Sequence, residues 1–253
     1  MPPELGPSVH ETLSDFEQSN IILVEWETPL LRRLGYPLAP KPDLVFLVPD
    51  EQLQVANDIA KARGLLNDNH PPSYLSELAG QGFRYVYGNP KRLLMLAPLS
   101  WTGIKKEELM AVAPSARQPS YTTWTVPLPV FCVAYLRIIM QESAGSRVRV
   151  MAIADLSSVI AYSMFDMGYE GDCMLGPEDV IDEGIEIQRH VEEDMAANKD
   201  ALDMQNALNS IREWHFTEDA EWARGTLIQL VSGTLRYEDL PSNGRQGVMD
   251  EDE

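Results

Sequence analysis

IILVEWETPLLRRLGYPLAPKPDLVFLVPDEQLQVANDIAKARGL, residues 21–65, is the stretch that decides the fold. Near its start, residues 20–26 are β-branched and apolar, which predicts a buried strand. A second apolar run, residues 44–48, has no polar break, as expected of a strand that is covered on both faces. The stretch therefore predicts two strands of a small sheet, separated by a proline-rich turn.

A helix is predicted after each of these strands. Thr28 is placed to cap the first helix, with Pro29 at its first helical position and Gly35 at its end. Asp50 is placed to cap the second helix, and Gly64 ends it. The order strand, helix, strand, helix predicts an α/β unit.

Two more short strands are predicted at residues 83–87 and 92–96, on either side of the turn Gly88-Asn89-Pro90. After that the apolar periodicity becomes helical. The helical segments are residues 129–142, 147–166, 177–197, 201–214 and 219–235. The predicted fold class is α+β, with a small mixed sheet flanked by helices and a helical C-terminal region.

The chain is predicted to divide where its composition changes. Residues 1–18 contain three prolines and little periodic apolar content, which predicts a flexible arm. An α/β core follows at residues 19–125, and a helical region packed on the core at residues 126–240. Residues 241–253 end in the acidic run MDEDE and predict a disordered acidic tail.

Charge and cysteine content exclude several classes of partner. The chain has 253 residues and a formal net charge of −19, which opposes contact with a phosphate backbone, so we expect no nucleic-acid partner. Only two cysteines occur, Cys132 and Cys173, without a CxxC motif, which favours an intracellular, cytoplasmic location. The apolar runs at residues 126–140 and 148–165 are too short and too interrupted by charge to predict a membrane span.

The opening stretch resembles the nucleotidyltransferase-like fold, in the form found in divergent fungal proteins of unknown function. The matching residues are Trp26, Glu27, Leu31, Gly35, Pro37 and the run VPDEQL at residues 48–53. The later run LLMLAPLSWTGI, residues 93–104, is similar to the strand and aromatic turn that such proteins carry downstream. The resemblance covers roughly the first hundred residues and implies a sheet of nucleotidyltransferase-like type.

In an active enzyme of that fold, the resemblance implies two Mg²⁺ ions held by carboxylates. Two of these carboxylates stand two residues apart on one strand, because side chains alternate between the faces of a sheet, and a third comes from a neighbouring strand. A glycine turn before the first helix lets the backbone approach the triphosphate.

This chain departs from that pattern at each point. Glu25-Trp26-Glu27 replaces the glycine turn. Asp43 is present on the metal-binding strand, but Lys41 and Val45 occupy the positions where its partner belongs. The later predicted strands contain no acid. We therefore expect no cofactor, with Mg²⁺ required only if the protein is an active enzyme.

The candidate ligand-binding residues are Glu25, Glu27, Asp43 and Trp101. The three acids remain near the ancestral site, and the aromatic side chain either lines a pocket or seals the junction between sheet and helices.

Three functions follow from these observations. The favoured one is a non-catalytic protein that binds a small-molecule ligand or a protein partner in the cleft between its sheet and its helices. The second is an active metal-dependent nucleotidyltransferase that acts on a small molecule or protein, with the three acids as unorthodox metal ligands. The third is an acidic protein-interaction module that uses residues 178–200 and the tail to contact a basic partner.

Overall fold

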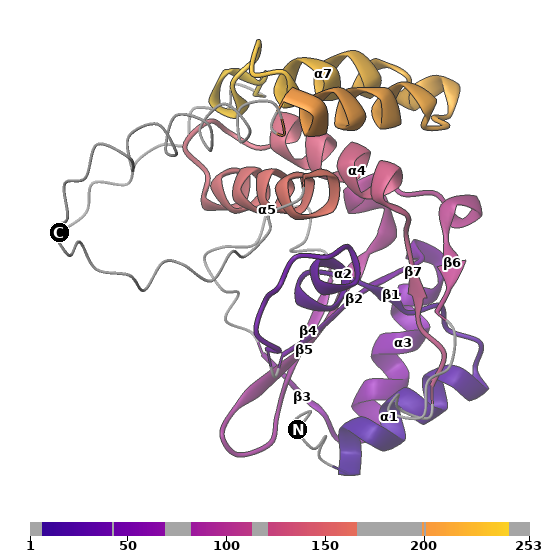
Figure 1. Cartoon of the computed structure of the whole chain (residues 1–253). Helices are drawn as coiled ribbons and strands as arrows, with labels where there is room; N and C mark the ends of the chain where they lie inside the picture. Colours follow the sequence, from indigo (N-terminus) through magenta and orange to yellow (C-terminus); the bar gives the residue numbers. More distant parts are fainter. Residues whose placement is uncertain are drawn as a thin grey trace, which may run out of the picture.

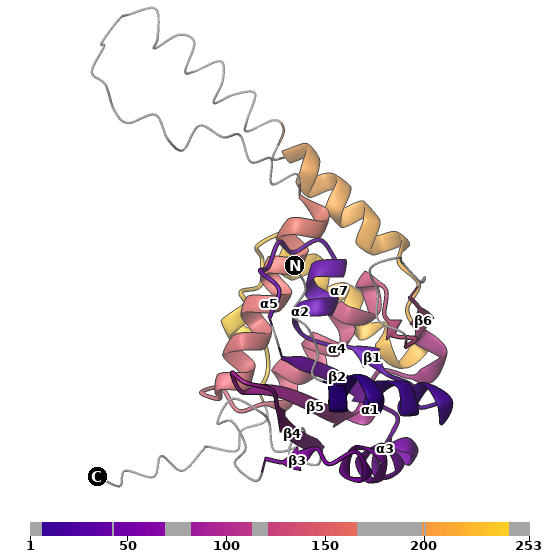
Figure 2. The ribbon, with the colours of Figure 1, turned by 90° about the horizontal axis from the view of Figure 1, so that it is seen from below.

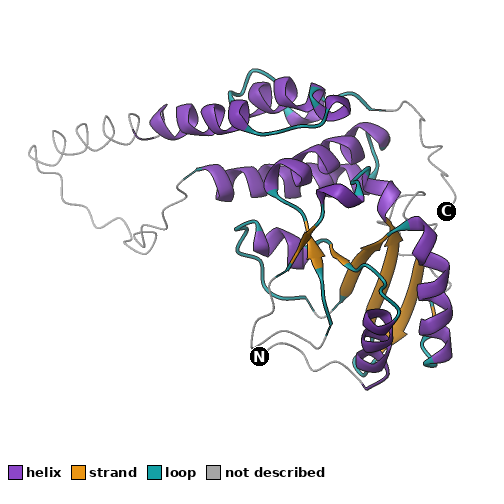
Figure 3. Cartoon of the chain, turned by 90° about the vertical axis from the view of Figure 1, so that its right-hand side faces the viewer, coloured by secondary structure: helices purple, strands orange, loops and turns teal. Residues whose placement is uncertain are grey.

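A mixed sheet with helices on both faces forms the centre of the molecule, so the fold is α+β (Figures 1 and 3). The structure is a computed structural model that describes residues 7–41, 43–68, 82–112, 121–165, 199 and 201–242. Within those residues, no helix is long and apolar enough to cross a membrane.

The described part of the sheet has seven strands in the order β3-β4-β5-β2-β1-β7-β6. The parallel pairs are β2 with β5 and β1 with β7, and the other neighbours are antiparallel. The strands are β1 Val24–Glu25, β2 Leu44–Val48, β3 Leu66–Asn67, β4 Phe83–Tyr87, β5 Arg92–Pro98, β6 Met110–Ala111 and β7 Trp124–Thr125.

The central strands are apolar on both faces, as predicted from the unbroken run in β2. Side chains alternate along a strand, so Val45 and Leu47 face one hydrophobic core while Phe46 and Val48 face another. β5 continues the same pattern beside β2. Because neither face carries polar groups at these positions, both need a covering layer of helices.

α1 (Pro7–Gln18) and α3 (Asp50–Ala62) cover one face and lie side by side (Figures 1 and 2). The predicted flexible arm is therefore wrong for residues 7–18, which form α1. Val9, Leu13 and Phe16 are fully buried and recur at helical spacing, a pattern that the nearby prolines obscured. Pro7 is compatible with a helix because it occupies the first position of α1, where its missing N–H costs no hydrogen bond.

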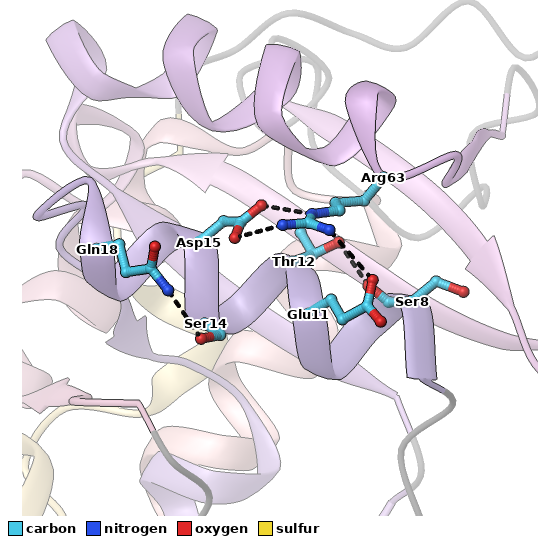
Figure 4. A network of polar contacts seen from close by, with 7 residues as sticks. All are labelled: Ser8, Glu11, Thr12, Ser14, Asp15, Gln18 and Arg63. Carbon is cyan, nitrogen blue, oxygen red and sulfur yellow. Dashed lines mark hydrogen bonds and ion pairs between the residues drawn. The ribbon is translucent and has the colours of Figure 1, made fainter.

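An arginine just after α3 joins it to α1 (Figure 4). The Nε and Nη2 atoms of Arg63 donate to the two carboxylate oxygens of Asp15, at 2.5 and 2.8 Å, and its Nη1 lies 3.3 Å from Glu11. The hydrogen bond from Arg63 lowers the pKa of the Asp15 carboxyl. These groups are exposed to solvent, so salt weakens the pairing, and the apolar contacts between the helices supply most of the stability.

The other face is covered by a helical layer, and a second pair of helices lies outside it (Figure 3). α4 and α5 lie next to the sheet, and the helical residues 201–213 and α7 lie beyond them (Figure 1). The helices on this side are α2 Thr28–Arg33, α4 Leu128–Gln141, α5 Arg147–Met164 and α7 Trp222–Val231. Short 3-10 turns are η2 Leu99–Thr102, η3 Lys106–Glu108, η4 Glu218–Ala220 and η5 Tyr237–Asp239. The helix predicted at residues 177–197 lies outside the described residues.

Two predicted helix caps are wrong. α2 begins at Thr28 itself, with Glu27 as its cap residue, so the Thr28 hydroxyl does not cap the helix. α3 begins at Asp50 with Pro49 as its cap residue. The Asp50 carboxylate instead accepts hydrogen bonds from the N–H and the hydroxyl of Ser100, at 3.1 and 2.5 Å, and so connects α3 to the end of β5.

A buried arginine in α5 holds the last described segment against the helices. Arg149 is 3% exposed, and its guanidinium donates to the carbonyls of Pro241 at 3.0 Å, of Leu240 at 2.6 Å and of Ile139 at the end of α4. Burial lowers the pKa of this guanidinium. These hydrogen bonds to backbone carbonyls replace the ones that the guanidinium and the carbonyls make to water in the unfolded chain.

We predict that Arg149→Leu lowers the free energy of unfolding by about 3 kcal/mol, because it leaves several buried carbonyls without a donor. Denaturant unfolding measures this change. Arg236→Ala is the matched control, since this arginine lies in the same C-terminal segment but is largely exposed, and it should change stability by less than about 0.5 kcal/mol. Equal effects of the two substitutions would contradict the assigned role of Arg149.

Candidate functional site

A cavity of about 140 Å³ lies between the sheet and the helices α2, α4 and α5. Its walls are mainly apolar and aromatic, including Trp26, Trp101, Tyr135 and Ile138. Its polar lining residues are Glu27, Thr28, Lys41 and Asp155. A cavity of this size is close to the roughly 150 Å³ that holds benzene in an engineered protein core.

Three aromatic rings form one wall of the cavity. Trp26 stacks on Tyr135 with 5.2 Å between ring centroids, and it meets the edge of Trp101 at 5.9 Å. All three side chains belong to the core that joins the sheet to α4 and α5. Trp101 therefore does both things that the sequence left open, because it seals this junction and also lines the cavity.

Glu27 is held in an unusual backbone conformation at the entrance to α2. Its φ is +51° and its ψ is −130°, a region that glycine adopts easily and that a side chain disfavours by about 1–3 kcal/mol. Burial raises the pKa of the Glu27 carboxyl, and the nearby Asp155 and Asp43 raise it further, while Lys41 opposes them. Both the backbone and the carboxylate of this residue therefore cost stability.

A second carboxylate enters the cavity from α5. Burial raises the pKa of Asp155 to about 6, although Lys41 and a hydrogen bond from the Tyr135 hydroxyl partly offset that shift. Burial also raises the pKa of Tyr135, and the neighbouring acids add to this effect, so the hydroxyl stays protonated and donates to Asp155. The cavity thus combines two acids of raised pKa with one lysine.

Two polar atoms of the lining residues have no hydrogen-bond partner among the described residues. They are the Thr28 hydroxyl oxygen and the Trp101 Nε1, and the two residues are 5% and 7% exposed. Thr28 is the first residue of α2, whereas a threonine that caps a helix stands one residue before it, so the Thr28 hydroxyl does not bond to the first turn of the helix. Buried polar groups normally find partners, so the Trp101 N–H is available to donate to a ligand and the Thr28 hydroxyl to donate or accept.

A second groove of about 300 Å³ adjoins the cavity and shares Trp26, Glu27, Thr28, Lys41 and Met151 with it. Its floor is the sheet, where Asp43, Val45, Leu93 and Met95 line it. The Asp43 carboxylate accepts a hydrogen bond of 2.8 Å from the Leu93 N–H and so bridges the start of β2 to β5.

Glu25 lies apart from the other predicted site residues. Its carboxylate forms a paired contact with Arg33, with distances of 2.6 and 2.8 Å. It lines a neighbouring depression that shares Thr28 and Lys41 with the cavity but contains neither Glu27 nor Asp43. Of the four predicted residues, the structure brings Glu27 and Trp101 together in the cavity and Glu27 and Asp43 together in the groove.

The sequence interpretation did not select Asp155, Tyr135 or Lys41 as site residues. Asp155 carried a usable signal, since it is a single acid in the otherwise apolar middle of α5. Lys41 stands at a position where the resemblance places a carboxylate, and nothing else in the sequence marks it as a site residue. Tyr135 had no distinguishing signal, because an aromatic residue on an apolar helix is ordinary core material.

The donors around the groove do not fit a pair of Mg²⁺ ions. In the described residues, no three His, Cys, Asp or Glu side chains are arranged to hold a metal ion. The positions on β2 and β5 that line the groove carry Val45, Leu93 and Met95, whose side chains supply no oxygen ligand. Glu25 is engaged by Arg33 on the other side of α2.

Comparison of the chain with models of protein families found no match, and neither did a search of curated proteins. The residues of the cavity and the groove are therefore the basis for a proposed function.

We predict that Asp155→Asn makes the protein more stable at about pH 7. The pKa of Asp155 is near 6 in the folded state and about 3.9 in the unfolded state, so the folded state holds the proton more tightly. The free energy of unfolding therefore falls as the pH rises between these two values. The asparagine variant lacks this loss, so its advantage should appear above about pH 6 and vanish below about pH 4. Denaturant unfolding across this range tests the prediction, and a constant difference at every pH would contradict it.

We predict that Glu27→Gly raises the free energy of unfolding by about 1 kcal/mol, because glycine adopts the observed backbone conformation without strain but has more freedom to lose on folding. Glu27→Ala is the matched control, since it removes the same carboxylate but keeps a Cβ atom. Thermal and denaturant unfolding should rank the glycine variant above the alanine variant. The reverse order would mean that the backbone at residue 27 is not strained.

Proposed function

We propose that the protein is a non-catalytic binding protein, built on a degenerate nucleotidyltransferase-like frame, that holds a small ligand in the cavity between its sheet and its helices. The order of elements supports the frame. β1 leads directly through Trp26 and Glu27 into α2, and β2 then leads into α3 and finally to β5. The resemblance implies the glycine turn between β1 and α2, the metal-binding strand at β2 and the strand of the third carboxylate at β5.

The conformation of Glu27 adds support for this ancestry. The resemblance implies a glycine turn before the first helix, and the backbone there still has a conformation that favours glycine. A glutamate in this position places a negative charge where a phosphate would approach. This arrangement favours a ligand that is not a nucleoside triphosphate.

The observation that carries the proposal is the content of the groove. Asp43 lines the groove just before β2, the strand residues that line it carry no carboxylate, and the Asp43 carboxylate accepts a hydrogen bond from the Leu93 N–H. A single carboxylate cannot hold two metal ions in the geometry that phosphoryl transfer requires. On this proposal, the degenerate frame lacks the carboxylates that two-metal phosphoryl transfer requires.

A small ligand fits the geometry better than a protein partner does. The cavity is small and concave and is lined by side chains from the sheet and three helices, whereas a protein interface needs a broad exposed surface. The third alternative uses residues 178–200 and the tail 241–253, and of these all but residues 199, 241 and 242 lie outside the described residues.

A pyrophosphate-release assay with Mg²⁺ and each nucleoside triphosphate tests the absence of catalysis. We expect no metal-dependent release above background, and the same result for Asp43→Asn. Release by the unaltered protein that disappears in Asp43→Ala would overturn the proposal, because it would make Asp43 a metal ligand.

A further inference from the structure

We propose that the cavity selects a small organic cation, a protonated amine or amidine carried on an apolar body of about the size of benzene and bearing one hydrogen-bond acceptor. This inference rests on the proposed function, because it presupposes that the cavity holds a small ligand.

The carboxyl groups that line the cavity favour a cationic ligand. Glu27 and Asp155 both line it, and neither carboxylate forms an ion pair with another described residue. Lys41, which is exposed, is the one basic residue among the described residues that line the cavity, so two carboxyl groups share the cavity with a single ammonium group. A charge in an apolar surrounding is stable only when it is paired and hydrogen-bonded, and an ammonium or amidinium group supplies both to two carboxylates.

The aromatic wall favours the same class of ligand. Trp26, Trp101 and Tyr135 present electron-rich rings beside the two carboxylates, and a cation near such a ring is attracted by its quadrupole. The same rings and the neighbouring Leu31 and Ile138 give an apolar ligand body a surface to contact.

The unpaired polar atoms define the rest of the ligand. Trp101 Nε1 is a donor without an acceptor, and the Thr28 hydroxyl can either donate or accept. These are independent of the carboxylates and lie on residues of the same cavity. An oxygen acceptor on the ligand would satisfy Trp101, while its cationic group satisfies Glu27 and Asp155.

The volume of the cavity matches a ligand body of a single small ring or its equivalent. About 140 Å³ is enough for a benzene-sized group, which is far smaller than a nucleoside triphosphate. The proposal therefore differs in both charge and size from a nucleotide site.

The test compares three probes that share one ring but differ in charge: benzylamine, benzyl alcohol and benzoate. Isothermal titration calorimetry near pH 7.5 gives the affinities, and tryptophan fluorescence reports contact with the aromatic wall. We expect benzylamine to bind at least about tenfold more tightly than benzyl alcohol, because its hydrogen bonds are charge-assisted, and benzoate to bind most weakly. Adding a para-hydroxyl to benzylamine should tighten binding in the unaltered protein but not in Trp101→Phe, which lacks the indole N–H.

Matched variants assign the selectivity to the two carboxylates. Glu27→Gln and Asp155→Asn should each weaken benzylamine about tenfold while changing benzyl alcohol little, since they keep the shape of the side chain. Asp58→Asn is the control, because it removes one carboxylate from α3 on the opposite face of the sheet. Circular dichroism and thermal unfolding confirm that each variant is folded, and either of the two cavity variants is sufficient for the test.

The outcomes separate this inference from the proposed function. Equal affinity for the three probes, tighter binding of benzoate, or no binding by any probe would overturn the cation proposal. A neutral or anionic probe that binds, and is excluded when Ala152→Met fills the cavity, would leave the ligand-binding function standing. Metal-dependent pyrophosphate release would overturn the non-catalytic function whatever the probes do.

Discussion

The pairing of β2 with β5 is the constraint on which the rest of the structure depends. The two strands run parallel over five residue pairs, and their side chains are apolar on both faces. A parallel pair of this kind cannot leave a face in water without exposing a continuous apolar surface. The chain therefore supplies helices from its beginning, α1 and α3, for one face and helices from its second half, α4 and α5, for the other.

The cavity forms where this second covering layer meets the edge of the sheet. α4 and α5 pack over the central strands, while α2 and residues 36–41 fill the space beside them. The rings of Trp26, Trp101 and Tyr135 pack against one another at this point and form one wall of the cavity. Polar residues line the remaining space, which explains how a site arises at a junction that otherwise belongs to the core.

Sequence patterns predicted the elements that local periodicity determines. The strands β2, β4 and β5 and the helices α3, α4 and α5 lie within a few residues of their predicted bounds. The site was predicted only in part, because Glu27 and Asp155 come together through tertiary packing of distant segments. A strand pattern also does not reveal the ion pair between Glu25 and Arg33. It does separate Glu25 from Trp26, because the side chains of successive residues point to opposite faces of a sheet.

Glu27 destabilises the folded state in two ways. Its backbone occupies a conformation that a side chain disfavours, and its carboxylate is buried among other acids without an ion pair to a described residue. A structural role would require a contact within the fold that offsets these costs, as the hydrogen bonds of Asp43 and Asp50 do for their carboxylates. The described contacts of Glu27 provide none. Strain and uncompensated burial at one position in a cavity are the features of a group held ready for a ligand, and they give Glu27 a stronger claim to function than any acid that the fold already uses.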